Sequence, residues 1–235
     1  MSSESRRDEK DVAPLGVRPL VGLALLEAVR DSDLPSETFE DEDLAYTMPR
    51  RFGVNRVMSV QIRQYQEAVR RRQRMSDDEL VSLVRLVTRR PDSEEIFRLA
   101  GERLGGEGGS GPGWYRIVPE RLRRRRAARN VRRRIRNLFG RPFGPVAATP
   151  LTLESDLDLL VRGDPGGEAC LLMGELLRTI AERHLTQAAE VLHVECQVRG
   201  GPRCRWEVVS DAEAKDGLRS GNDGWEGKSH GGFGR

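Results

Sequence analysis

The stretch HVECQVRGGPRCRW, residues 193–206, decides how the last third of this 235-residue chain folds. It carries His193, Cys196 and Cys204 around a Gly-Gly-Pro turn, and Cys170, the remaining cysteine, lies 23 residues before His193. Thiolates and imidazoles are the ligands that zinc prefers, and four of them complete its tetrahedral shell. The residue types and their number therefore predict a structural zinc site formed by these four side chains.

Two further roles for the cysteines stay open. Free cysteines often act as small buried hydrophobic residues, and Cys196 and Cys204 could form a disulfide across a hairpin. The odd number of cysteines and the absence of a signal peptide argue against an oxidising compartment.

Strand geometry restricts how the zinc site can form. Residues three apart in a regular strand point to opposite faces, so an unbroken strand cannot direct both His193 and Cys196 at one metal ion. We therefore expect either a bulge near Glu195 or a strand that ends there. Alternating patterns predict strands over residues 189–195 and 203–210, and also over 151–154 and 156–161. Leu172, Leu176 and Ile180 recur every four residues in a helix predicted over 168–184.

These residues resemble the vinyl-4-reductase domain. The resemblance rests on the Gly-Glu-Ala-Cys run that ends at Cys170, the helix after it, His193-x-x-Cys196, Gly200-Gly201, Cys204 and Trp206. The family includes bacteriochlorophyll 4-vinyl reductase and the sensor domains of aromatic-responsive bacterial regulators. Its zinc-bearing sensors carry Cys, Glu, Cys and Cys at this spacing, and His193 stands in the place of the Glu. The resemblance is firmest over residues 155–210, extends over 15–140 and does not include the tail.

The resemblance implies an α+β fold of the kind found in TRAPP transport-particle subunits, with a helical N-terminal part packed on a small antiparallel sheet. It also implies a pocket for an apolar small molecule and a homodimer. Leu172, Met173 and Leu176 in helix 168–184 are candidates for the pocket wall, although ordinary core positions are the favoured interpretation. Gly174 has no Cβ and would let a ligand or another backbone approach this helix.

Composition indicates a soluble protein with a modest core, because 37% of the residues are hydrophobic and 33% are charged, with a net charge of +3. The longest apolar run is too short to span a membrane, so we expect a cytoplasmic protein. Residues 1–14 and 211–235 are polar or glycine-rich and are expected to be disordered. Between them we expect a helical part over 15–140 and the zinc-bearing α/β part over 150–210, joined by a Pro/Gly-rich connector.

The helical part is predicted from apolar periodicity and capping signals. Helices are expected over residues 18–30, 54–73, 76–87 and 92–104, and Ser76 with Glu79 forms a capping box. A loop over 31–43 carries seven carboxylates, and glycines over 105–113 predict a flexible loop. His184 is interpreted as the C-terminal cap of helix 168–184.

The helix predicted over residues 119–139 has an unusual charge. Eleven arginines and no acidic residue lie between Arg121 and Arg141. Leu122, Ala128, Val131, Ile135 and Leu138 are its expected apolar side. The arginines taken as candidates for binding an anionic partner are Arg123, Arg124, Arg125, Arg126, Arg132, Arg133 and Arg134. The favoured partner is the acidic loop 31–43 or another acidic protein surface, followed by anionic lipid or a carboxylate-bearing ligand, with nucleic acid last because no aromatic residues are interleaved.

No catalytic constellation, dinucleotide fingerprint or flavin signature is found in the sequence. The favoured function is therefore an accessory or regulatory protein that binds an apolar small molecule and carries structural zinc. One alternative is a protein of bacteriochlorophyll or tetrapyrrole biosynthesis, which the family name implies. The other is a regulator that acts through an anionic partner.

Overall fold

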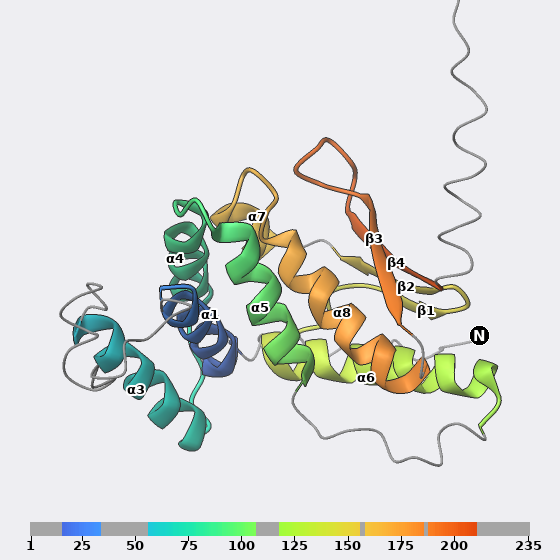
Figure 1. Ribbon diagram of the computed structural model, residues 1–235, viewed down its shortest axis with the longest axis horizontal. Helices are drawn as coiled ribbons and strands as arrows, with labels where there is room; N and C mark the ends of the chain where they lie inside the picture. Colours follow the sequence, from blue (N-terminus) through green and yellow to red (C-terminus); the bar gives the residue numbers. More distant parts are fainter. Residues whose placement is uncertain (1–15, 34–55, 107–117, 156–157, 186–187, 211–235) are drawn as a thin grey trace, which may run out of the picture.

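The computed structural model describes residues 16–33, 56–106, 118–155, 158–185 and 188–210 (Figure 1). The two expected disordered ends, most of the acidic loop and the glycine-rich segment from residue 107 lie outside these ranges. Among the described helices, none has both the length and the apolar character needed to cross a membrane.

Helix α8 (Cys170–Leu185) lies at the centre of the fold, between α5 (Ser93–Gly106) and a small sheet (Figure 1). The sheet contains β1 (Val146–Ala148), β2 (Leu151–Ser155), β3 (Ala189–Glu195) and β4 (Cys204–Ser210). Its strands are antiparallel in the spatial order β1-β2-β4-β3. The expected α+β class, with a helical part packed on a small antiparallel sheet, is therefore confirmed.

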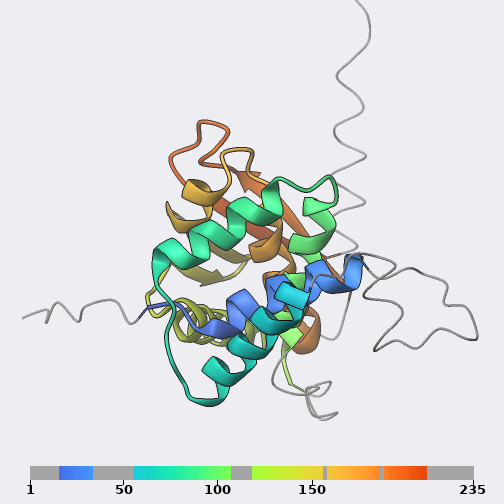
Figure 2. The ribbon, with the colours of Figure 1, turned by 90° about the vertical axis from the view of Figure 1, so that its left-hand side faces the viewer.

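Helix α1 (Pro19–Ser32) is the core of the helical part. It contacts α3 (Arg56–Arg70), α4 (Asp77–Thr88) and α5, and Figure 2 shows α3 lying along it. Nearly all of α1 is buried because its sequence is apolar on every side. The Ser76 half of the expected capping box is present, since the Ser76 hydroxyl accepts a hydrogen bond from the Glu79 N–H at 3.2 Å. The Glu79 carboxylate accepts a hydrogen bond from the Tyr65 hydroxyl.

A close contact between α5 and α8 joins the helical part to the sheet. A Cβ atom built on Gly101 would lie 2.4 Å from the Leu172 carbonyl oxygen, so only glycine allows the two backbones to approach this closely. The buried residues of both parts form one continuous hydrophobic cluster. Residues on either side of the Pro/Gly-rich connector therefore share a core.

Three local predictions were wrong. Residues 158–163 form a short helix, α7, rather than a strand, because adjacent Leu159 and Leu160 are both buried and the helix packs on α4. The connector contains β1, a strand too short to have a recognisable pattern. Gly105 and Gly106 belong to α5, since the tight contact with α8 continues past Leu104 and favours small residues there.

The arginine-rich helix α6 (Glu120–Phe139) runs beneath α8 and the sheet, along the lower edge of Figure 1. Ala128, Val131, Ile135 and Leu138 are buried as predicted. Leu122 is not: 47% of its surface is exposed, because it lies on the solvent side of the first turns.

His184 is a buried link between α8 and α6 rather than a C-terminal cap. Its Nε2 lies 2.8 Å from the Asn130 side-chain nitrogen. Burial, together with the charges of Arg183 and Arg126, lowers the pKa of His184 below its ordinary value. The neutral imidazole is therefore the form that the fold favours.

We predict that Gly101→Ala destabilises the protein by about 1–3 kcal/mol, because the added methyl group overpacks the α5–α8 contact. This cost exceeds the gain of about 1 kcal/mol that alanine brings to a helix. The matched control is Gly106→Ala, whose Cβ would have its nearest neighbour, the Arg183 guanidinium, at 3.7 Å. Urea unfolding of both variants measures the difference, and equal stabilities would contradict the close contact.

The lowered pKa of His184 predicts a pH dependence of stability. The unfolded chain takes up a proton near the ordinary histidine pKa of 6.5, whereas the folded chain resists protonation. Stability should therefore be full above that pH and decline as the pH falls below it. We expect His184→Gln to lose this part of the decline when urea unfolding is compared at pH 7.5 and 5.5. A decline of the same size in both proteins would assign it to other groups.

Candidate metal centre

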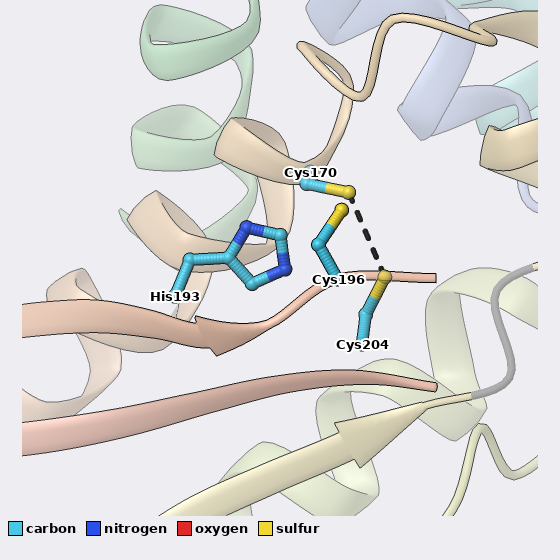
Figure 3. A group of neighbouring side chains, drawn as sticks. All are labelled: Cys170, His193, Cys196 and Cys204. Atoms are coloured by element: carbon cyan, nitrogen blue, oxygen red, sulfur yellow. Dashed lines mark hydrogen bonds between the residues drawn. The ribbon is translucent and has the colours of Figure 1, made fainter. Parts of the chain in front are cut away.

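The four predicted ligands meet at one point in the structure. One ligand atom each from Cys170, His193, Cys196 and Cys204 lies within 4.8 Å of the others (Figure 3). The three cysteines are buried and free, so the disulfide alternative between Cys196 and Cys204 does not describe this structure. The sulfurs of Cys170 and Cys204 are 3.8 Å apart. This is about the edge of a tetrahedron whose corners lie roughly 2.3 Å from a central zinc ion.

Cys170 is positioned by the start of α8 and by a buried carboxylate that precedes it. The Asp164 side chain is fully buried and accepts hydrogen bonds from the backbone N–H groups of Gly166 at 2.9 Å and Ala169 at 2.6 Å. It thereby holds the tight loop that leads into the helix. Asp164 was not among the residues predicted from the sequence, although Asp followed by Pro-Gly-Gly just before a helix is typical of a capped entry.

Both expected departures from a regular strand occur after His193. The register of β3 against β4 shifts between His193 and Glu195, and β3 ends before Cys196. The Cys196 carbonyl then accepts hydrogen bonds from the N–H groups of Arg199 and Gly201, at 3.1 and 2.9 Å. The tight turn returns the chain so that Cys204 opens β4, where it pairs with Ser155 of β2.

His193 has a buried nitrogen without a partner. Its ring stacks on Trp206 with the centroids 4.9 Å apart and the planes 6° from parallel. One edge of the ring faces the sulfurs (Figure 3), and the buried Nε2 has no hydrogen-bond partner. An unpaired buried imidazole nitrogen is costly in a folded protein unless it binds a cation.

The pKa values of Cys170 and Cys204 are shifted in opposite directions. Hydrogen bonding from the Cys170 thiol lowers the pKa of Cys204, which also accepts from the Gln197 N–H. The pKa of Cys170 is raised because its thiol donates to Cys204 and is buried. A divalent cation bound by both sulfurs would displace the proton of the Cys170 thiol. The donor set, its burial and the orphaned nitrogen all fit a metal ion such as zinc.

Glu195 lies beside the cluster but is held by another partner. Its carboxylate is 3.7 Å from the Arg203 guanidinium, which also binds Glu154 at 2.7 Å. These ion pairs connect β2, β3 and β4 next to the turn. His193, and not this nearby carboxylate, therefore supplies the fourth ligand atom of the cluster.

A cleft of about 630 Å³ lies beside the cluster. Its lining residues include Cys170 and His193 of the cluster, together with Gly174 and Trp206. Both apolar and charged side chains line it; the charged ones include Glu94, Arg98, Glu175 and Arg178. Leu172, Met173 and Leu176 do not line this cleft, because all three are fully buried in the core. The favoured interpretation of these three as core residues agrees with their burial.

The predicted anion-binding arginines of α6 divide into two groups. Arg123 donates to the Leu185 carbonyl at 2.8 Å, Arg134 donates to the Leu104 carbonyl at 2.8 Å, and Arg124 pairs with Glu120 at 2.8 Å. Arg126 is also partly buried. These four face the protein itself, whereas Arg125, Arg132 and Arg133 are exposed.

The described part of the acidic loop does not pair with α6. Asp31 forms an ion pair with Arg103, and Asp33 pairs with Arg90 at 2.6 Å. The other carboxylates of the loop lie outside the described residues.

Searches against protein-family models, curated proteins and solved structures find no match to this chain.

We predict that the purified protein contains about one zinc ion per chain and that Cys204→Ser removes most of it, because a hydroxyl replaces a thiolate ligand. Elemental analysis after dialysis against a chelator measures the metal content. Substitution with cobalt should give the visible spectrum of a tetrahedral thiolate site.

Glu195→Gln is the matched control, because this side chain adjoins the cluster without contributing a ligand atom to it. We expect it to keep its zinc, whereas His193→Ala should lose affinity. If Glu195→Gln loses zinc and His193→Ala keeps it, the proposed ligand set is wrong.

Proposed function

We propose that this protein is a small-molecule-binding protein of the vinyl-4-reductase-domain type, with an accessory or regulatory role. Zinc held by Cys170, His193, Cys196 and Cys204 would fasten α8 to the β3–β4 hairpin. The observation that carries the proposal is that Cys170 and His193 belong both to the metal cluster and to the wall of the adjacent cleft.

The zinc would be structural in this proposal. The protein supplies four ligands, so no position is left at a tetrahedral ion for a substrate or an activated water. Because the ligands come from the start of α8, the end of β3 and the start of β4, the ion would join segments that are distant in sequence. Metal binding would then contribute to folding and would shape one wall of the cleft.

The cleft suggests an amphipathic ligand rather than a purely apolar one. Leu171, Val191 and Trp206 offer apolar surface, and the Arg199 guanidinium offers positive charge, whereas Arg98 is paired with Glu94 at 3.0 Å. A ligand with a flat apolar body and an acidic group would satisfy both kinds of wall. Trp206 lies close over Gly174, since an added Cβ would contact its ring at 3.6 Å, so a larger side chain at this position would compete with the ligand for the space beside Trp206.

We predict that Gly174→Leu abolishes ligand binding and leaves the zinc in place, because the larger side chain would fill the cleft above Trp206. Anilinonaphthalene sulfonate is a suitable probe, since it combines an apolar ring system with one negative charge. Its fluorescence titration, together with native mass spectrometry of any co-purifying molecule, measures binding.

The control is Gly106→Ala, a glycine substitution in α5 away from this cleft, which should bind the probe like the unmodified protein. Equal binding by Gly174→Leu would show that the cleft is not the ligand site. Loss of zinc in Gly174→Leu would show a disturbed fold instead, which is why elemental analysis accompanies the titration.

A further inference from the structure

The exposed arginines of α6 form a single stripe. They are Arg121, Arg125, Arg129, Arg132, Arg133 and Arg136. At about 100° of rotation per residue, all six fall within a sector of about 120° on one side of the helix. The opposite side carries Ala127, Val131, Ile135 and Leu138, which are buried in the core. Packing of the apolar side therefore forces the six guanidinium groups to face outward together.

No carboxylate among the described residues pairs with this arginine stripe. Arg132 donates a hydrogen bond to the Val146 carbonyl oxygen at 3.0 Å. Arg121, Arg125, Arg129 and Arg133 follow one another at intervals of four residues, which places like charges side by side and destabilises an isolated helix. An array of this kind is stabilised by a partner that presents negative charge at a similar spacing.

A groove runs beside the stripe, between α6 and β1. Its volume is about 470 Å³, and it is lined by Arg125, Arg129 and Arg132 together with Leu122, Ala128, Val146 and Ala148. The groove therefore offers apolar surface together with the hydrogen-bond donors of three arginines. The helix that carries them is held in place from the other side, where Arg123 and Arg134 bind carbonyl groups of α8 and α5.

We propose that the arginine stripe binds the phosphate backbone of a DNA duplex, independently of sequence. From Arg121 to Arg136 the stripe extends about 22 Å, because an α-helix rises about 1.5 Å per residue. Its six arginines therefore give a linear charge density of about one positive charge per 4 Å. Measured along the duplex axis, each strand contributes one phosphate every 3.4 Å or so, so a duplex carries negative charge at a linear density at least as high as that of the stripe. Backbone binding of this kind needs no aromatic stacking, because the bases stay paired.

Two other anionic partners fit the structure less well. A helix that lies in a membrane surface buries an apolar face in the lipid, but the apolar face of α6 is already buried in the core. The described carboxylates of the predicted acidic loop are Asp31, in the last turn of α1, and Asp33 just after it, and both pair with arginines outside α6. This proposal does not depend on the proposed zinc or ligand function, since the two sites share no residue.

The test is the salt dependence of duplex binding by the full chain, measured by fluorescence anisotropy with a labelled 20-base-pair DNA. Six phosphate contacts predict a slope of log affinity against log salt of about −5, or roughly a thousandfold loss between 50 and 200 mM salt. In Arg125→Gln/Arg129→Gln/Arg133→Gln three contacts remain, so we expect a slope of about −3 and weaker binding at low salt. The matched control, Arg63→Gln/Arg70→Gln/Arg89→Gln, removes three exposed arginines outside the stripe and should bind like the unmodified protein.

Absence of duplex binding at 50 mM salt would overturn the proposal, and so would equal slopes for the two triple variants. Binding to phosphatidylserine vesicles that duplex DNA cannot displace would assign the stripe to a membrane surface instead. Binding to a peptide of residues 34–45, without binding to DNA, would assign it to the acidic segment. Circular dichroism of each variant ensures that a lost interaction is not a lost fold.

Discussion

Three sulfur atoms and one imidazole nitrogen are brought together in the interior of this protein, and the arrangement of its C-terminal part depends on their contact. The pKa of Cys170 is raised by its contact with Cys204, and the buried Nε2 of His193 has no hydrogen-bond partner. Structural zinc contributes an apparent binding free energy of about 10–16 kcal/mol in small zinc-binding peptides. A whole domain is stable by only about 5–15 kcal/mol. A metal ion at this site would therefore contribute a free energy comparable with the whole net stability of a domain.

The consequences of this contact extend along α8. Cys170 is the first residue of that helix, so the cluster defines where α8 begins relative to the sheet. The same helix contacts α5 at Gly101 and Gly105, where only glycine allows so close an approach. Helix α8 therefore links the position of the cluster to the packing of the N-terminal helices. The cleft lies beside this connection and shares Cys170 and His193 with the cluster. The proposed metal and the proposed ligand would therefore affect each other's binding, equally in both directions, by linkage.

Charge is segregated in the same structure. Most carboxylates of α1, α4 and α8 whose partners are described pair with arginines of their own or neighbouring helices. Glu175 pairs with Arg178 in α8, and Asp33, just after α1, pairs with Arg90. On α6 the pattern differs, because Arg123 and Arg134 bind backbone carbonyls of neighbouring helices, whereas no carboxylate of the described residues pairs with the stripe. A net charge of only +3 therefore conceals a strongly positive surface on one helix.

The amino-acid sequence by itself determined which residues could bind a metal, the α+β class and most element positions, because these depend on local chemistry. Cys and His select soft metals, Ser76 caps a helix within three residues, and alternating strands show their period over a few positions. Only the tertiary structure decided which leucines lie in the core, that residues 158–163 pack on α4 as a helix, and that Leu172, Met173 and Leu176 do not line the cleft. It also decided which arginines of α6 face solvent, since that choice depends on which side of the helix meets α8 and the sheet. Such outcomes come from contacts between segments far apart in the chain, and no local pattern contains them.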